Sequence, residues 1–180
     1  GKFSDKEINY AIDALKNHES GNSWVQNLEK KFCDIMGVKY SIACNSGTSG
    51  LHAALFAVGV KEGDEVIMPA LTVVMDAYAV IHLKATPIFV DVDLKTHLID
   101  VKEIEKKITS KTKAIITVSW DGLSCDMDPI MELAKKHKIK VIDDSARTVL
   151  GKYNNRIAGT IADISVFSFE SKKHISAGGE

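Results

Sequence analysis

Cysteine, long apolar runs and excess charge of either sign are all scarce in this 180-residue chain. The three cysteines, Cys33, Cys44 and Cys125, show no C-x-x-C spacing and follow no signal peptide, which indicates reduced thiols and a cytoplasmic protein. No run of about 18 apolar residues occurs, so no membrane span is expected. The net charge of -1 gives no basic excess, so no nucleic-acid partner is expected. No metal site is predicted either.

Strand-like and helix-like segments alternate along the chain, which has 45% hydrophobic residues. This pattern predicts an α/β domain with a mainly parallel sheet. Ser4 and Glu7 form a capping box for the first helix, and Asp126 or Asp128 is expected to cap a helix near Pro129. Helices are expected at 4–17, 24–35, 72–82, 99–109 and 130–137, and strands at 40–44, 65–68, 85–93, 113–118, 140–142 and 164–169.

A turn of small residues follows the strand expected at 40–44. It reads N-S-G-T-S-G and leads into a helix with an apolar face. Free amides at a helix N-terminus, preceded by a small flexible turn, form a natural phosphate site. Most such turns are purely structural, so the pattern alone makes Gly47, Thr48 and Ser49 candidates and no more.

An acidic strand end and a lysine pair occur in the last forty residues. One apolar run ends in Asp143 and Asp144, and the next is followed by Lys172 and Lys173. Ligands of open α/β sheets lie outside the carboxyl ends of the strands, so acid and amine can face one ligand there. Pyridoxal phosphate chemistry uses this pair, because a lysine forms a Schiff base with the cofactor and an aspartate keeps its ring nitrogen protonated. On spacing alone, two strand-end charges that face water are the more common explanation.

The sequence of these last forty residues resembles that of the nucleotide-sugar aminotransferase family, a branch of the fold type I pyridoxal phosphate enzymes related to aspartate aminotransferase. The matching pieces are I-D-D-S-A-R at 142–147 and F-S-F-E-S-K-K-H-I-S-A-G at 167–178. In the family, F-S-F is followed by three residues, the Schiff-base lysine and a glycine-rich tail. The S-G-T-S at 46–49 resembles the family's phosphate-binding S-G-T, and similarity extends from about residue 20 to the end.

The resemblance implies a role for each matched residue. Lys173, five positions after Ser168, would be the catalytic Schiff-base lysine, with Lys172 as a solvated neighbour. Asp144 would hold the ring nitrogen and Asp143 would support the strand end. The phosphate would be held by Gly47, Thr48, Ser49 and Ser168, and the sugar nucleotide would lie near Ser20, Gly21 and Asn22, which fit an ordinary helix–helix turn equally well.

Two residues depart from the family pattern. Val73 stands where the family commonly has an aromatic side chain stacked on the pyridine ring, and Trp120 and Tyr78 are the candidates to compensate. Arg147 stands where the family usually has a glutamine that binds the cofactor's phenolic oxygen. Arginine can make a charge-assisted bond there, and its charge would lower the proton affinity of the Schiff base.

The resemblance implies a three-layer fold, a mainly parallel sheet with helices on both faces. Residues 1–180 would form the large cofactor-binding domain, truncated before the small C-terminal domain. Because family sites are completed by a second subunit, a homodimer is expected.

The function expected from the resemblance is pyridoxal phosphate-dependent transamination in deoxyamino sugar biosynthesis. An amino acid, glutamate in the family, would donate the amino group and a keto-sugar nucleotide would accept it. One alternative is a sugar dehydratase, which has histidine in place of the lysine, and His174 lies next to Lys173. Another is a non-catalytic regulatory relative, favoured by the changes at Val73 and Arg147.

Overall fold

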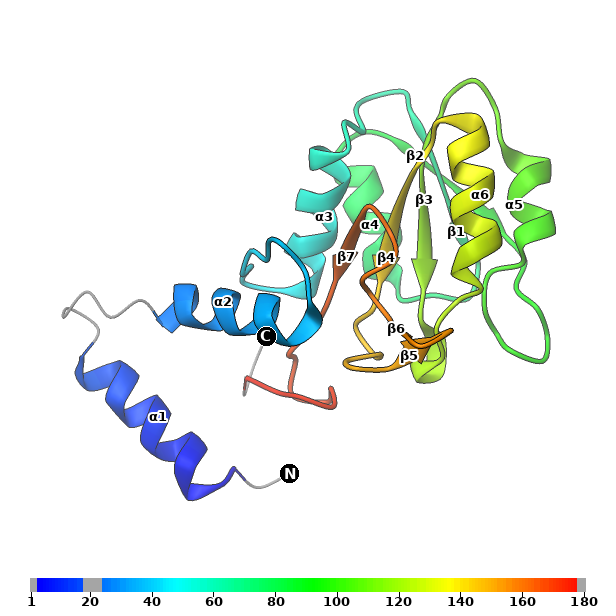
Figure 1. Cartoon of the computed structure of the whole chain (residues 1–180). Coiled ribbons are helices and arrows are strands. Elements are labelled where there is room, and N and C mark those ends of the chain that lie inside the picture. Colours follow the sequence, from blue (N-terminus) through cyan, green and yellow to red (C-terminus); the bar gives the residue numbers. More distant parts are fainter. Residues whose placement is uncertain (1–2, 18–23, 178–180) are drawn as a thin grey trace. The chain divides into compact units, whose positions relative to one another are not determined.

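The structure is a computed structural model that describes residues 3–17 and 24–177. The chain divides into two units, residues 1–43 and residues 44–180 (Figure 1). Among the described residues, no helix has both the length and the apolar character needed to cross a membrane.

The first unit consists of helices α1 (Asp5–Lys16) and α2 (Trp24–Met36) and the segment after them. The predicted capping box is confirmed, because the Ser4 hydroxyl accepts the Glu7 N–H at 3.3 Å and the Glu7 carboxylate accepts the Ser4 N–H at 2.6 Å. The ring of Tyr10 meets that of Trp24 edge to face, with centroids 6.2 Å apart.

The strand predicted at 40–44 is wrong. The segment is exposed and carries no strand. Polar groups of α2 hold it instead, because the Ser41 hydroxyl donates to the Glu29 carbonyl at 2.7 Å and the Ala43 N–H donates to the Glu29 carboxylate at 2.8 Å. With a side chain satisfying its backbone, this apolar run needs no neighbouring strand.

The second unit is a parallel sheet of five strands with helices on both faces, as predicted. The strands lie in the order β2-β1-β3-β4-β7, and every pair in this sheet is parallel. The strands are β1 (Glu65–Pro69), β2 (Thr86–Val90), β3 (Thr112–Val118), β4 (Lys140–Asp144) and β7 (Ile164–Val166), and the helices are α3 (Gly47–Ala57), α4 (Val74–His82), α5 (Val101–Lys107), the short η1 (Trp120–Gly122) and α6 (Met127–His137).

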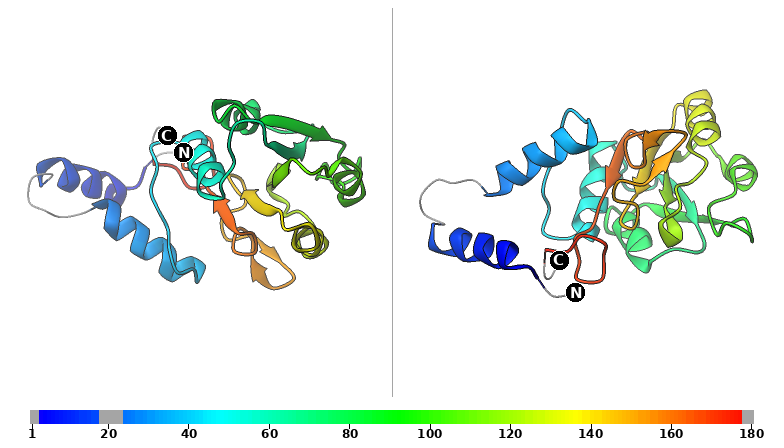
Figure 2. Two further views of the ribbon diagram at one scale, coloured as in Figure 1. Left: turned by 90° about the horizontal axis from the view of Figure 1, so that it is seen from above. Right: turned by 60° about the horizontal axis from the view of Figure 1, so that its bottom comes forward.

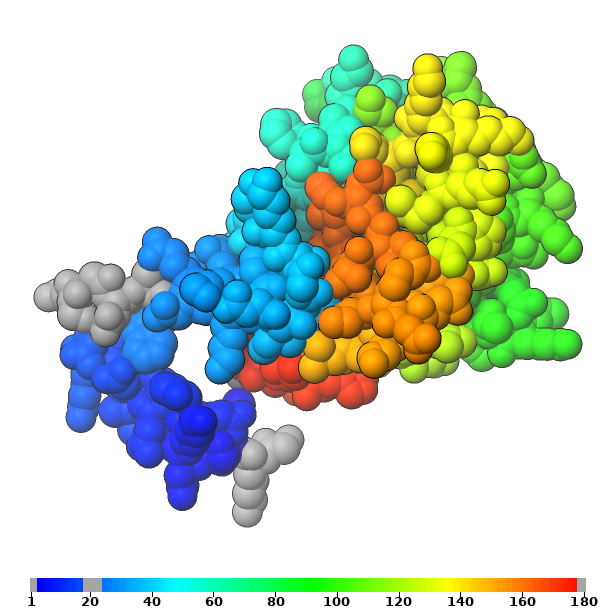
Figure 3. Space-filling model, in the orientation of Figure 1, coloured from blue at the N-terminus to red at the C-terminus, as the bar shows by residue number. Residues whose placement is uncertain are grey.

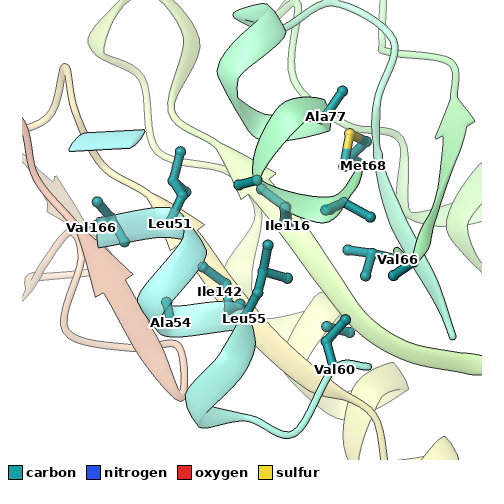
Figure 4. Close-up of a cluster of buried hydrophobic side chains, with 14 of the residues drawn as sticks. Leu51, Ala54, Leu55, Val60, Val66, Met68, Ala77, Ile116, Ile142 and Val166 are labelled. Carbon is teal, nitrogen blue, oxygen red and sulfur yellow. The ribbon is translucent and has the colours of Figure 1, made fainter. Parts of the chain in front are cut away.

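Successive residues of each strand face opposite layers, as the pleat requires. On β3, Ile116 packs in the layer under α3 and α4, whereas Ile115 packs in the layer with α6. Figure 4 shows Leu51 and Leu55 of α3 beside Ile116 and Ile142 of the sheet. The two views of Figure 2 show helices on either side of the strands. Alternation therefore places Asp144 on the face of α3 and α4, and Asp143 on the opposite face.

The structure corrects the capping prediction for the start of α6. A small hairpin, β5 (Lys152–Tyr153) with β6 (Arg156–Ile157), binds the two acidic side chains expected to cap this helix. Asp126 is the N-cap of α6, but its side chain makes no capping bond and accepts a hydrogen bond from the Tyr153 hydroxyl. Asp128 pairs with Arg156. In Figure 3 the orange hairpin lies directly against the start of α6. Both carboxylates therefore fasten the hairpin rather than the helix end.

Candidate active site

The strand order places a ligand crevice between β1 and β3. The chain passes from β1 to β2 on one side of β1 and then crosses back to β3 on the other side. The direction of the connections therefore reverses between β1 and β3, which is the switch point of the sheet. In open α/β sheets such a point leaves a crevice outside the carboxyl ends of the strands. Val73 follows β1, and Ser119 follows β3 directly.

A cleft occupies this position and holds about 280 Å³ of space between its atoms, part of it open to solvent. Four residues predicted to bind or react with a cofactor meet here, although they are far apart in the sequence. The cleft is lined by Val73, Val118, Ser119, Trp120, Asp144, Ala146, Arg147 and Lys173.

Lys173 is distinguished from its neighbours by burial. Its side chain is half-buried and lines the cleft, whereas Lys172 and His174 are both exposed. A turn fixes the backbone here, since the Lys173 N–H donates to the Glu170 carbonyl at 2.9 Å. Of these three side chains, Lys173 is the one placed to react with a ligand in the cleft.

Asp144 ends β4 at the bottom of the cleft and is 5% exposed. One carboxylate oxygen accepts the Ala146 N–H at 3.0 Å. Burial is the main cause that raises the pKa of Asp144 to about 6, opposed by the Ala146 N–H and by the charges of Lys173 and Arg147. A buried carboxylate with two cations nearby suits a ligand group that carries a proton.

Asp143 lies on the other face of the sheet and takes no part in the cleft. It accepts hydrogen bonds from Thr117 at 2.9 Å and from Ser145 at 2.7 Å. Burial raises the pKa of Asp143, and the two hydroxyl groups oppose that rise. These bonds join β3, β4 and the turn after β4, which fits the expectation that Asp143 supports the strand end.

The start of α3 lies beside Ser168, as a shared phosphate site would require. A Cβ placed on Gly47 would lie 3.3 Å from the Ser168 Cβ, so the glycine permits a close approach here. The amides at Gly47 and Thr48 lie in the first turn of α3. The Ser49 N–H already donates to the Ser46 hydroxyl at 3.1 Å, so Ser49 offers its hydroxyl more readily than its amide.

The aromatic candidates divide between cleft and surface. Trp120 lines the cleft together with Val73, whereas Tyr78 is 47% exposed on α4 and is not part of the cleft. Trp120 is therefore the side chain placed to supply the aromatic surface that Val73 lacks. The third set of predicted residues, Ser20, Gly21 and Asn22, lies outside the described residues.

Two residues of this region were missed by the sequence reasoning. Ser119 is 1% exposed and lines the cleft, and its hydroxyl has no hydrogen-bond partner among the described residues. Asp76, in the first turn of α4, is completely buried, and one of its oxygens also lacks a partner there. The burial of Asp76 could have been inferred from the sequence, because Asp76 lies next to Ala77 within the apolar pattern of its helix.

A second cavity, with about 840 Å³ of space between its atoms, lies away from these groups and is open to solvent. Asp93, Lys102 and Tyr153 are among its lining residues. In the described part of the chain, no group of three or more histidine, cysteine, aspartate or glutamate residues could hold a metal ion. The smaller cleft, which gathers a lysine, an arginine and the buried Asp144 carboxyl group, is therefore the candidate active site.

This cleft has the features that pyridoxal phosphate needs. The Ser119 hydroxyl is a buried polar atom without a partner among the described residues, and Ser119 lines the cleft. Asp144 can hold a protonated ring nitrogen, Lys173 can reach an aldehyde, and the turn at Gly47 with Ser168 leaves room for a phosphate. The residues present thus fit this group.

Fold and site together define a parallel α/β domain with a lysine–aspartate cleft at its switch point. The comparisons with known proteins make the class specific. The chain belongs to the DegT/DnrJ/EryC1/StrS aminotransferase family, whose match covers residues 2–180.

Similarity to individual proteins is strong. GDP-perosamine synthase of Caulobacter vibrioides is 40% identical over 98% of this chain and 48% of its own length. The solved aminotransferase of Psychrobacter cryohalolentis matches with a TM-score of 0.96 and 35% identity, over 99% of this chain and 46% of its own. The Escherichia coli GDP-4-keto-6-deoxy-D-mannose-3-dehydratase, solved with hydrated PLP bound, matches with a TM-score of 0.90 and 26% identity, over 98% and 47%. The chain spans about half the length of the curated relatives it matches.

Proposed function

We propose that this chain is the cofactor-binding part of a pyridoxal phosphate-dependent aminotransferase that transfers an amino group from glutamate to a keto-sugar nucleotide. The observation that carries the proposal is the meeting of Lys173, Asp144 and Arg147 in one cleft. The family and the similarity to a GDP-perosamine synthase support the sugar nucleotide as acceptor. The small C-terminal domain would lie in the remaining half of the relatives' length.

When bound, pyridoxal phosphate supplies an electron sink that stabilises a carbanion at the carbon bearing the nitrogen. The Asp144 carboxylate would accept a hydrogen bond from the protonated ring nitrogen and keep that proton in place. Lys173 Nζ would hold the cofactor through its aldehyde and would be the base that moves the proton of the substrate carbon.

Other residues orient the cofactor. The Arg147 guanidinium would donate to the phenolic oxygen, and Trp120 and Val73, which also line the cleft, would supply apolar surface for the ring. The first amides of α3, the Ser49 hydroxyl and Ser168 would hold the phosphate. Ser20, Gly21 and Asn22 are proposed to contact the sugar nucleotide.

The test uses the full-length protein loaded with pyridoxal phosphate. Given glutamate and a GDP-linked 4-keto sugar, it is expected to release 2-oxoglutarate and form the amino sugar. The variant Lys173→Ala should release none, while the matched variant Lys172→Ala, at an exposed lysine, should retain the activity. A loaded protein that yields no 2-oxoglutarate contradicts the proposal.

A sugar dehydratase is the second candidate, because a solved dehydratase with PLP matches the chain. That chemistry uses histidine in place of the lysine, yet Lys173 lines the cleft and His174 is exposed. Transamination therefore fits the site better. A sugar product that has lost a hydroxyl group and gained no nitrogen would favour the dehydratase, and a full-length protein that binds no cofactor would favour the non-catalytic relative.

The protein is further proposed to be a cytoplasmic homodimer. An exposed apolar face on α4 supports a subunit contact, since Val74, Met75 and Ile81 are each at least 40% exposed. The three unpaired cysteines support a reducing compartment. Sedimentation at micromolar concentration should give a dimer, and a monomer would contradict this part of the proposal.

A further inference from the structure

Asp76 is a buried carboxyl group that the proposed chemistry does not yet use. It lies in the first turn of α4, three residues after Val73, and has no exposed surface. Its Oδ2 accepts a hydrogen bond from the Thr72 hydroxyl, and its Oδ1 has no partner among the described residues. A carboxyl group that is buried with half of its hydrogen-bonding capacity unused needs an explanation.

Asp144 lies on the same face of the sheet, and the two carboxyl groups interact. Burial is the main cause that raises the pKa of Asp76 to about 7, and the charge of Asp144 adds to the rise. Asp144 has the lower pKa, about 6, because the Ala146 N–H, Lys173 and Arg147 stabilise its charge. Asp144, beside the two cations, is the group more easily ionised, and Asp76, whose pKa is not lowered by a cation, is the group more easily kept protonated.

The other ionisable groups near α4 do not reverse this division. On the helices, the ring of His52 on α3 contacts His82, which ends α4 at the far end from Asp76, with centroids 6.1 Å apart. In the sheet, Asp143 faces the opposite layer, but its charge raises the pKa of Asp144, and this is opposed by the Ala146 N–H and by the charges of Lys173 and Arg147. The remaining ionisable residues of β1, β3 and β4 lie at or near the starts of their strands, namely Glu65, Lys113 and Lys140. The cations nearest the pair, Lys173 and Arg147, act on Asp144.

We propose that Asp76 is a positioning residue that acts on the cofactor's ring nitrogen through Asp144, by remaining the protonated member of this pair of buried carboxyl groups. This inference rests on the proposed function, because it assumes a ring nitrogen at Asp144. While Asp76 is neutral, Asp144 carries the single negative charge and holds the ring proton. When Asp76 ionises, a second negative charge strengthens the hold on that proton, so the ring nitrogen stays protonated to higher pH.

The first experiment needs no cofactor. Infrared difference spectra of the cofactor-free full-length protein should show a protonated-carboxyl C=O band that disappears as the pH rises, with a midpoint near pH 7. The component with this midpoint should be absent in Asp76→Asn and retained in Asp143→Asn, whereas the band of Asp144, whose pKa is about 6, should remain in Asp76→Asn. Its midpoint should move up in Thr72→Val, because the lost hydrogen bond favoured the ionised form, and down in Asp144→Asn, because the like charge is removed.

A matched control separates this effect from general disturbance. Thr117 donates to Asp143 as Thr72 donates to Asp76, so Thr117→Val removes an equivalent hydroxyl and should leave the Asp76 band unchanged. A wild-type spectrum without an Asp76-dependent band above pH 5 overturns the inference. So does an equal shift in the two threonine variants.

The second experiment reads the ring nitrogen itself. With nitrogen-15-labelled pyridoxal phosphate bound, the ring nitrogen of Asp76→Asn should lose its proton at lower pH than that of wild type. Identical profiles overturn the inference. If the protein binds no cofactor, the proposed function fails while the infrared result still decides whether Asp76 holds a proton, so the two failures are distinguishable.

Discussion

Replacing Asp76 by asparagine should change how the stability of the cofactor-free protein depends on pH. Asp76 has a pKa of 3.8 when exposed and about 7 in the folded state. Because the folded pKa is the higher one, the folded state binds the extra proton between these values. Stability from this group is therefore complete below pH 3.8 and is lost as the pH rises through about 7.

The magnitude follows from the same two values. At about 1.4 kcal/mol for each pKa unit, the difference corresponds to about 4 kcal/mol. This is an upper limit, because part of the rise in the pKa of Asp76 comes from the charge of Asp144, which itself titrates in this range. An asparagine neither gains nor loses the proton, so the gain of Asp76→Asn over wild type should grow by roughly 2–4 kcal/mol between pH 4 and 8.

Urea unfolding of the full-length protein at several pH values, followed by tryptophan fluorescence, measures this difference. A constant offset reports the loss of the Thr72 hydrogen bond and is ignored. Asp93→Asn is the control, because backbone and side-chain hydrogen bonds from Thr96 and Lys95 lower the pKa of Asp93, so its titration lies below pH 3.8. Its offset from wild type should stay flat from pH 5 to 8. Parallel curves for Asp76→Asn and wild type would refute the reasoning.

Three further predictions concern the backbone and the cleft. Gly159→Ala should lower the free energy of unfolding by roughly 2–4 kcal/mol, because φ is +79° and the new Cβ would lie 2.2 Å from Phe167; Gly63→Ala, with φ +85° and open space around it, should lose only about 1 kcal/mol in the same urea titration. Arg147→Gln should raise the pH midpoint of the bound cofactor's visible absorbance, since a positive charge is removed; an unchanged or lower midpoint counts against the assignment. Asp144→Asn should weaken cofactor binding at least about 10-fold in an absorbance titration, and wild-type affinity would show that Asp144 does not hold the ring.

The elements were predictable where local chemistry decides them. Ser4 and Glu7 start α1 as their spacing indicates, and uninterrupted apolar runs form β1 and β3. The prediction failed at 40–44, where Glu29 satisfies the backbone from a helix. It failed again at Asp126, whose side chain binds Tyr153. In both cases a partner distant in sequence provides the competing hydrogen bond, which periodicity cannot reveal.

The residues of the cleft were predictable only in part. Strand ends meet at one edge of a parallel sheet, so Asp144 and Lys173 were expected to lie together, and they do. Asp76 was missed because an acid in the first turn of a helix ordinarily faces water and favours the helix dipole. Only the packing of α4 against the sheet buries it and brings it under the influence of Asp144.

The central claim is that Lys173 is the residue that holds the cofactor. The most direct test adds pyridoxal phosphate to the full-length protein, reduces it with borohydride and identifies the modified peptide by mass spectrometry. The account predicts a pyridoxyl group on Lys173 and none on Lys172. A protein that shows the cofactor's absorbance but carries no label on Lys173 would contradict it.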